Sequence, residues 1–380
     1  MRKKLKEVCD FYSGTGFPVK YQGEDNGELP FYKVGDIANN AVAGNVYLSL
    51  CNNFISHGVA KEIRGTIIPA DVVVFAKIGE ALKLNRRAIT SCDCLIDNNA
   101  MGIGAKSEYL NSMYFYFFMK NLKMENLAES TTVPSVRKTK LEEMEMEVPA
   151  FDEQSEIVDI LAKLQKVINY RQEQLVKLDE LIKARFVEMF DGKYPEDTLL
   201  NLCNIIDYRG KTPEKVECGL PFITAKNVKM HHMTLEPREY ISKETYDKVM
   251  VRGFPKEGDV VFTTEAPLGN VCRIPHFDTE FYIGQRIVTI QTDALNPTYL
   301  EYTLSDEEFV RKYMGKSSGS TVTGIRVRLL EQLTIPVPPR TLQDEFSIFV
   351  EQVDKSKVAI QKSLDETQLL FDSLMQKYFG

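Results

Sequence analysis

Two stretches of the chain carry apolar residues at alternating spacings of four and three, the heptad pattern of a helix that buries one seam. The first seam comprises Ile157, Leu161, Leu164, Ile168, Leu175, Leu178 and Ile182. The second comprises Phe346, Val350, Val353, Ile360, Leu364, Phe371 and Leu374. Each stretch is predicted to form one long helix, and Gly192 and Gly380 are consistent with the two helix ends.

A lone helix with a one-sided apolar stripe would leave that stripe in water, so each predicted helix needs a partner. Each helix is the obvious partner of the other. An antiparallel coiled coil is favoured, because a parallel pair would crowd the segments that precede the two helices at one end. The alternative is that both seams are ordinary core packing within one domain.

The chain is an internal repeat, which decides how the rest of the pattern is interpreted. The segment from Leu141 to Pro149 aligns with Leu330 to Pro338 at a shift of 189 residues, and Gln154 aligns with Gln343 at the same shift. The shift drifts by a few residues towards the N-terminus, where Leu29-Pro30-Phe31 aligns with Leu220-Pro221-Phe222 and Asp71-Val72-Val73 with Asp259-Val260-Val261. Each copy is therefore about 190 residues long.

Ahead of each long helix the pattern is that of mixed structure. Short β-branched or aromatic runs predict strands at 71–75, 259–262 and 286–291, and helical spacing occurs at 109–122 and 297–313. We expect an α+β fold in which two repeated α+β domains are separated by a pair of long antiparallel helices, with pseudo-twofold symmetry. The expected segments are a first domain at 1–150, a central helix at 151–192, a second domain at 193–339 and a distal helix at 340–380.

Composition excludes several classes of protein. A length of 380 residues with 43% hydrophobic and 27% charged residues indicates a globular chain of more than one domain. The net charge of -7 comes partly from the helical stretches, with 7 Lys+Arg against 9 Asp+Glu over 152–193 and 4 against 7 over 341–380. No run approaches the roughly 18 apolar residues of a spanning helix. Seven scattered cysteines suit a reducing compartment, so we expect a cytoplasmic protein.

The sequence offers no convincing catalytic or metal site. It lacks a glycine-rich loop for a nucleotide or S-adenosylmethionine, and neither His231-His232 nor Cys92-Asp93-Cys94 has a spaced second pair of metal ligands. The segment from Asn296 to Tyr299 is similar to the base-holding loop of amino-methyltransferases but lacks its second proline. Because the segment also aligns with Ser107 to Leu110 in the first copy, we expect a helix start there instead. The chain is predicted to be non-catalytic.

Basic residues in the two domains carry the candidate binding chemistry. Five basic and no acidic residues lie between Phe309 and Leu330. Lys and Arg neutralise phosphates, Ser and Thr donate hydrogen bonds to them, and Arg and Gln make bidentate contacts with base edges. The candidates in the first domain are Lys77, Lys83, Arg86, Arg87, Arg137 and Lys138. Those in the second are Arg209, Lys211, Lys226, Arg273, Gln285, Arg286, Lys316, Ser317, Ser318, Arg326 and Arg328.

The order of these segments, and their occurrence in both copies of the repeat, resemble the specificity subunits of type I restriction-modification systems. The resemblance covers essentially the whole chain. The resemblance rests on Val148-Pro149 with Glu153-Gln154 and on Val337-Pro338-Pro339 with Gln343, each leading into a predicted long helix. Further marks are Phe75 to Gly79, Thr264 to Gly269, and Gln285-Arg286-Ile287. The chain departs from the family where Leu342-Gln343 replaces the usual Glu-Gln, and where the first domain lacks the Ala-Pro-Leu-Gly turn.

The resemblance implies that each domain is a target recognition domain for one half of a split double-stranded DNA sequence, with the helices fixing the gap. It implies no cofactor in this chain. Two methylation subunits would carry S-adenosylmethionine, and restriction subunits would use ATP and Mg²⁺, so the chain would be a non-catalytic, membrane-free part of a DNA adenine methyltransferase and endonuclease complex. Divergence between the domains predicts an asymmetric target. The alternatives are a coiled-coil assembly scaffold that binds proteins rather than DNA, and a stand-alone enzyme acting on nucleic acid, which the missing cofactor loop disfavours.

Overall fold

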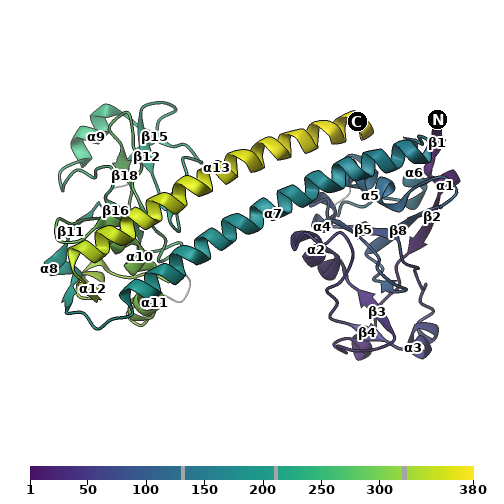
Figure 1. Ribbon diagram of the computed structural model, residues 1–380, viewed down its shortest axis with the longest axis horizontal. Helices are drawn as coiled ribbons and strands as arrows, with labels where there is room; N and C mark the ends of the chain where they lie inside the picture. The colour runs from purple at the N-terminus through teal and green to yellow at the C-terminus, as the bar shows by residue number, and fades with distance from the viewer. Residues whose placement is uncertain (130–132, 209–212, 319–322) are drawn as a thin grey trace. The chain divides into compact units, whose positions relative to one another are not determined.

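The chain divides into two compact units that each combine an α+β domain with part of the two long helices. The computed structural model describes residues 1–129, 133–208, 213–318 and 323–380 (Figure 1). Unit 1 consists of Met1–Gln174 and Ile360–Gly380, and unit 2 of Leu175–Ala359. This division differs from the four segments expected from the sequence, because each long helix contributes residues to both units. We call residues 1–150 domain 1 and residues 191–339 domain 2.

The described residues of domain 1 form three small sheets. The largest is antiparallel in the order β2 (Cys9–Ser13), β8 (Ala100–Ala105), β5 (Val72–Ala76), β6 (Arg87–Ile89). A second sheet has the order β4 (Phe54–Ile55), β3 (Leu29–Tyr32), β7 (Leu95–Ile96), and the third pairs β1 (Arg2–Lys4) with β9 (Glu145–Glu147). The helices are α1 (Leu5–Val8), α2 (Val34–Val42), α3 (His57–Glu62), α4 (Glu80–Lys83), α5 (Ser112–Asn121) and α6 (Lys138–Glu142), with 3₁₀ turns η1 (Val19–Tyr21) and η2 (Met124–Leu127).

Domain 2 repeats this arrangement. Its four-stranded sheet has the order β11 (Asn204–Asp207), β19 (Ile287–Gln291), β16 (Val260–Thr263), β17 (Val271–Arg273). Its smaller sheets are β15 (Tyr240–Ile241), β12 (Leu220–Ile223), β18 (Tyr282–Ile283), and β10 (Glu196–Thr198) with β20 (Thr334–Pro336). The helices are α8 (Leu199–Leu202), α9 (Lys243–Val249), α10 (Pro297–Ser305), α11 (Glu307–Met314) and α12 (Val327–Glu331). Domain 2 adds the hairpin of β13 (Val228–Lys229) and β14 (His232–Met233).

The repeat and the α+β fold class expected from the sequence are confirmed, with strand ends shifted by one residue or so. The helical stretch expected at 297–313 is two helices, because Asp306 adopts an extended conformation and caps the second one. Its carboxylate accepts a hydrogen bond from the Glu308 N–H at 2.9 Å. A side-chain cap of this kind restarts a helix after a break.

The core of domain 1 lies where β5 and β8 pack together. All five residues of β5 are buried, as expected for a central strand covered on both faces. Opposite it, β8 has glycine at 102 and 104. A Cβ atom on Gly102 would lie 2.9 Å from a methyl carbon of Val72, so glycine leaves room for the Val72 side chain on the neighbouring strand.

The two predicted long helices are α7 (Phe151–Phe190) and α13 (Arg340–Phe379), each of 40 residues. Every predicted seam residue on them is buried or half-buried, as a heptad seam requires. In unit 2, Phe346 near the start of α13 lies 5.5 Å from Phe190 at the end of α7, and Lys357 forms an ion pair with Asp179 at 2.6 Å. Residues near the end of α7 thus contact residues near the start of α13, and residues further from the end of α7 contact residues further along α13. The two helices are therefore antiparallel in unit 2.

Unit 1 shows the same antiparallel course. Lys120 of α5 donates a hydrogen bond to Gln165 of α7 at 2.6 Å, and its ammonium lies 5.3 Å from the Phe371 ring of α13. Tyr114 of α5 donates to the carbonyl of Glu147, just before α7, and its ring lies 5.1 Å from that of Phe379 at the end of α13. The start of α7 and the end of α13 therefore pack on the same helix of domain 1.

Each domain is fixed to the long helices by an equivalent pair of contacts. In unit 1 the Gln154 carboxamide accepts from the Asn111 N–H at 2.8 Å, and in unit 2 Gln343 accepts from the Asn296 N–H at 2.8 Å. Tyr299 of α10 corresponds to Tyr114, since it donates to the Pro336 carbonyl at 2.8 Å and lies 4.7 Å from the Phe190 ring. Buried glutamine side chains that bond to a helix start fix the position of that helix.

These contacts correct the expected alignment of Asn296 with Ser107. Asn111 and Asn296 are the equivalent residues, because each caps the helix that packs against the long helices and receives the same glutamine contact. The expected helix start at Asn296 is confirmed, because its side chain accepts a hydrogen bond from the Thr298 N–H at 2.9 Å. The repeat aligns here at a shift of 185, because the loop lengths differ between the two copies.

The packing of α10 against the two long helices predicts that one residue of α13 contributes strongly to the free energy of unfolding. The Phe346 ring is fully buried and meets Phe186, Phe190 and Tyr302 at 5.3 to 5.5 Å. We expect Phe346→Ala to lower the free energy of unfolding by about 3 to 5 kcal/mol, because it leaves a cavity in an aromatic cluster. Ile348→Ala is the control, since Ile348 is 57% exposed on the same helix and should cost no more than about 0.5 kcal/mol. Urea unfolding followed by circular dichroism measures both, and equal losses would contradict the docking role.

Candidate nucleic-acid interface

Three segments meet at one place in each domain. In domain 1 the Lys77 N–H, just after β5, donates to the Asn99 carbonyl at 2.9 Å, and the Val136 N–H donates to the Lys77 carbonyl at 2.9 Å. In domain 2 the Thr264 N–H, just after β16, donates to the Arg286 carbonyl at 2.8 Å, and the Ile325 N–H donates to the Thr264 carbonyl at 3.0 Å. The same backbone frame is therefore present twice.

A short hairpin stem lies beside this frame in both domains. Glu129 pairs with Ser135 in domain 1, and Ser318 pairs with Gly324 in domain 2. Each stem also bridges to the turn after the central strand, through Ile78 in domain 1 and Glu265 in domain 2. We call these segments the platform. It comprises the turn after the central strand, the residue that precedes the neighbouring strand (β8 or β19), the stem, and the start of the short helix that follows. Its residues are 77–78, 99, 129 and 135–138 in domain 1, and 264–265, 286, 318 and 324–328 in domain 2.

The platform of domain 1 collects three of the predicted cations. Lys77 is half-buried, Arg137 directly precedes α6, and Lys138 is its first residue. The side chain of Arg137 is 70% exposed and forms an ion pair with Glu129 at 2.9 Å. Lys138 pairs with Glu142 at 3.5 Å and lies 5.7 Å from the Phe11 ring. Exposed ion pairs of this kind are weak, so both cations can exchange the carboxylate for a phosphate.

The platform of domain 2 is more basic. Arg326 directly precedes α12, Arg328 lies in its first turn, and Lys316 lies beside the stem, all with exposed side chains. None of the three forms an ion pair with another residue in the part of the chain that the structure describes. Ser317 donates its hydroxyl to the Met314 carbonyl at 2.7 Å, and the Ser318 N–H donates to Gly324. Cations without a carboxylate partner are suited to phosphate oxygens.

Arg286 also belongs to the platform of domain 2, and Gln285 lies half-buried next to it. The Arg286 side chain is 53% exposed, and its Nε lies 2.9 Å from a carboxylate oxygen of Glu265. Its backbone has a φ of 75°, in the left-handed region that residues with a Cβ rarely occupy.

From the sequence we did not identify Asn99, Glu129 and Glu265 as neighbours of the predicted cations. The repeat at a local shift of 187 could have indicated Asn99, because it places Asn99 opposite Arg286.

The structure corrects the prediction that Arg87 contacts DNA. Its side chain is buried and donates to the carbonyls of Asn85 and Leu122 at 2.7 and 2.6 Å, and to the Asn85 side chain at 2.9 Å. Burial lowers the pKa of the Arg87 guanidinium to about 10. A guanidinium held by internal acceptors is part of the fold and cannot reach a phosphate at the surface.

The structure also corrects the prediction for Arg273, because its guanidinium forms an ion pair within unit 2. Its Nε lies 2.7 Å from one carboxylate oxygen of Glu301, a buried residue of α10, and His231 Nδ1 lies 2.9 Å from the other oxygen. The His231 ring stacks on Tyr302 at 4.3 Å. A buried carboxylate needs such partners, so this cluster explains Arg273 and His231 as structural residues.

The remaining predicted residues do not belong to the platforms as defined above, or they lie outside the described residues. Lys83 of α4 pairs with Glu80 at 2.8 Å, and Arg86 is half-buried after the same helix. Lys226 is exposed between β12 and β13. Arg209 and Lys211 lie outside the residues that the structure describes. The structure therefore brings together Lys77, Arg137 and Lys138 in one domain, and Gln285, Arg286, Lys316, Ser317, Ser318, Arg326 and Arg328 in the other.

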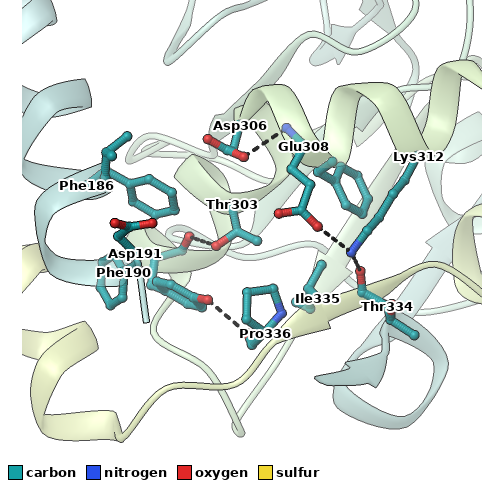
Figure 2. A pocket seen from close by; sticks show the side chains of 13 residues that line it. Phe186, Phe190, Asp191, Thr303, Asp306, Glu308, Lys312, Thr334, Ile335 and Pro336 are labelled. Atoms are coloured by element: carbon teal, nitrogen blue, oxygen red, sulfur yellow. Dashed lines mark hydrogen bonds and ion pairs between the residues drawn. The ribbon is translucent and has the colours of Figure 1, made fainter. Parts of the chain in front are cut away.

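A cavity of about 160 Å³ in unit 2 lies between the end of α7, helices α10 and α11, and β20 (Figure 2). Several of its polar groups bond to neighbouring protein groups. Lys312 reaches Glu308 at 3.2 Å and the Thr334 carbonyl at 3.2 Å, and Asp306 caps α11. Phe186 and Phe190 form its apolar side. The cavity is thus a gap in the packing of α7 on domain 2, and Lys312, Glu308 and Asp306 at its wall have partners within the fold.

Within the described ranges, no group of three or more His, Cys, Asp or Glu side chains is arranged to hold a metal ion. In the same ranges, no helix has the length and apolar character that crossing a membrane requires.

The fold and the paired platforms define a chain with two versions of one surface binding module, and comparison with known proteins identifies the family. A family model described as the type I restriction modification DNA specificity domain matches residues 1–180 and 196–367. The chain therefore belongs to the type I restriction-modification DNA specificity family. It is a DNA-specificity chain, and the duplicated match agrees with the two α+β domains.

Relatives and solved structures agree over the whole length. The chain is 20% identical to the type I restriction enzyme MjaIX specificity subunit of Methanocaldococcus jannaschii, over 99% of this chain and 91% of the relative. It is 23% identical to a putative type I restriction enzyme specificity subunit of Haemophilus influenzae, over 99% and 92%. The crystal structure of a specificity subunit from M. genitalium matches with a TM-score of 0.58 at 13% identity, over 100% of this chain and 96% of that one.

The buried position of Arg87 predicts an effect on stability. We expect Arg87→Ala to lower the free energy of unfolding by about 2 to 4 kcal/mol, because the buried side chain is removed and two part-buried carbonyls lose their donor. Lys83→Ala is the matched control, since the exposed Lys83–Glu80 pair should contribute less than about 1 kcal/mol. Urea unfolding of the full chain compares them. A stable Arg87→Ala chain with weakened DNA binding would restore Arg87 to the contact surface.

Proposed function

We propose that this chain reads a bipartite, asymmetric DNA target for a type I restriction-modification complex, each domain binding one half-site through its platform. The observation that carries this proposal is the duplicated platform: one backbone frame occurs in both domains with different side chains on it. Lys77 corresponds to Thr264, Asn99 to Arg286, and Glu129 to Ser318. Because the two backbone frames are alike, the two domains can dock on the duplex in the same way. Because the side chains on the frames differ, each domain can select different bases.

The electrostatics support a division between DNA-binding domains and acidic helices. The long helices carry an acid excess, whereas exposed cations gather on the platforms. Phosphate contacts supply affinity that does not depend on sequence, so these cations hold the duplex while other side chains select the bases. The alternative of an assembly scaffold without DNA readout is not favoured, because both halves of the chain match the DNA specificity family.

The remaining parts of the proposal concern the partners. The chain acts as the non-catalytic subunit and scaffolds two methylation subunits and the restriction subunits, which supply S-adenosylmethionine, ATP and Mg²⁺. Supporting this, the sequence has no glycine-rich cofactor loop, and one solved structure with a TM-score of 0.58 and 19% identity comes from work on complex assembly of the type I system. Exposed apolar residues on the long helices, such as Ile160, Val167 and Leu370, offer contacts to protein partners.

Mapping modified adenines tests the target. The full chain is produced with its methylation subunits in a host without type I modification, and N6-methyladenine is located across the genome. We expect one motif made of two short half-sites that differ in sequence, separated by a gap of unspecified bases. A symmetric target with two identical inverted half-sites would contradict the asymmetry, and adenine methylation without any split motif would contradict the proposed function.

The length of the helices should set the gap. Deleting one heptad from the middle of each helix, residues 169–175 and 358–364, keeps the seam in register and shortens each helix by about 10 Å. Because DNA rises about 3.4 Å per base pair, we expect a gap shorter by about three base pairs with both half-sites unchanged. Replacing the same residues by another heptad of equal length is the control. An unchanged gap in an active deletion variant would separate the helices from gap selection.

A further inference from the structure

The two platforms differ in side chains at positions that the backbone makes equivalent. The Asn99 carbonyl accepts from the Lys77 N–H, and the Arg286 carbonyl accepts from the Thr264 N–H, at 2.9 and 2.8 Å. Asn99 and Arg286 therefore occupy the same position in the two domains. Arg137 and Arg326 are also equivalent, since each directly precedes the short helix that follows the hairpin stem.

The shared arginine and the differing pair suit different kinds of contact. A residue that is the same in two readers of different sequences fits a feature that both half-sites have, and the sugar-phosphate backbone is such a feature. Arg137 and Arg326 meet this description, and both have exposed side chains. The position of Asn99 and Arg286 carries a different residue in each domain. A residue that differs between the two domains suits a contact with the bases, which differ between the two half-sites.

The conformation of Arg286 favours base contact. Its φ of 75° is disfavoured for a residue with a Cβ, and such backbone outliers are found at binding sites where the side chain is needed in one place. The Glu265 carboxylate lies 2.9 Å from Arg286 Nε and orients the guanidinium plane. The two terminal nitrogens are the donors that a bidentate contact with guanine O6 and N7 uses.

Asn99 has the matching chemistry for another base. It is exposed, and its backbone N–H donates to the Asp97 carboxylate at 2.6 Å, which fixes the turn that presents its side chain. An asparagine carboxamide pairs with N6 and N7 of adenine, whereas an arginine pairs with guanine. One position of the frame therefore holds the two side chains that best distinguish the two purines.

We propose that this shared position reads one purine in each half-site, guanine through Arg286 and adenine through Asn99, while Arg137 and Arg326 hold phosphates. The inference rests on the proposed function, because it assigns residues within the proposed DNA surface. It also assigns domains to half-sites, since a change at one position alters one half of the motif and leaves the other half unchanged.

The test exchanges the two residues in the full chain, assembled with its methylation subunits. For Arg286→Asn we expect the preference for guanine at one position of one half-site to fall by on the order of 10- to 100-fold, measured as relative methylation rates on duplexes that differ at that base. For Asn99→Arg we expect the preference for adenine to be lost at one position of the other half-site. Both variants should keep the gap and the remaining motif.

Two further variants separate base reading from phosphate binding and from folding. Arg326→Ala should weaken binding to all sequences alike and reduce the slope of log affinity against log salt by about 0.9, with the motif unchanged. Arg286→Gly relieves the left-handed backbone, so its melting temperature should equal or exceed that of the unaltered chain while the guanine preference is lost. Loss of preference in a chain that remains folded supports base reading by the side chain.

The outcomes distinguish the inference from the proposed function. If active complexes with Arg286→Asn, Arg286→Gly and Asn99→Arg methylate the same motif as the unaltered complex, this position does not read bases and the inference is overturned. It is equally overturned if Arg286→Asn weakens all duplexes uniformly, as a phosphate contact would. If the unaltered complex recognises no split motif, the proposed function itself is wrong, whatever the variants do.

Discussion

The packing of one domain helix against both long helices is the contact on which the rest of each unit depends. In unit 2, Tyr299 of α10 lies 4.7 Å from Phe190 at the end of α7, and Phe346 of α13 completes the cluster. The buried Gln343 fixes the start of α10 against α13. Aromatic clusters of this size contribute much of the packing energy of a small domain, and the glutamine adds direction. The helix beneath the four-stranded sheet is thereby held on the pair, and unit 1 repeats the arrangement with Tyr114, Phe379 and Gln154.

Charge is used in two ways that the sequence alone does not separate. Some cations are internal: Arg87 is held by carbonyl oxygens, and Arg273 pairs with the buried Glu301. Others are exposed at the platforms, where Arg326 and Arg328 project from the start of a short helix. Removing water from a charge is costly unless partners replace it, so internal cations acquire fixed partners and surface cations keep water that DNA phosphates can displace.

The duplicated frame explains how one fold serves two different half-sites. Backbone hydrogen bonds hold the turn, the stem and the strand start in the same positions in both domains, and they depend little on side-chain identity. Side chains on the frame can therefore change without moving it. The two domains have diverged in this way, since Lys77, Asn99 and Glu129 in one correspond to Thr264, Arg286 and Ser318 in the other. Recognition by side chains on a rigid frame is the arrangement that a specificity protein requires.

The sequence by itself determined the repeat, the α+β class, and the two heptad seams, because burial periodicity and duplication are visible in residue order. Tertiary structure decided which cations are available, since Arg87 and Arg286 look alike in sequence yet one is buried against carbonyls and the other is exposed beside Glu265. It also decided the true correspondence of Asn111 with Asn296, and of Asn99 with Arg286. These relations depend on contacts between residues far apart in the chain, and loops of unequal length conceal them from an alignment at constant shift.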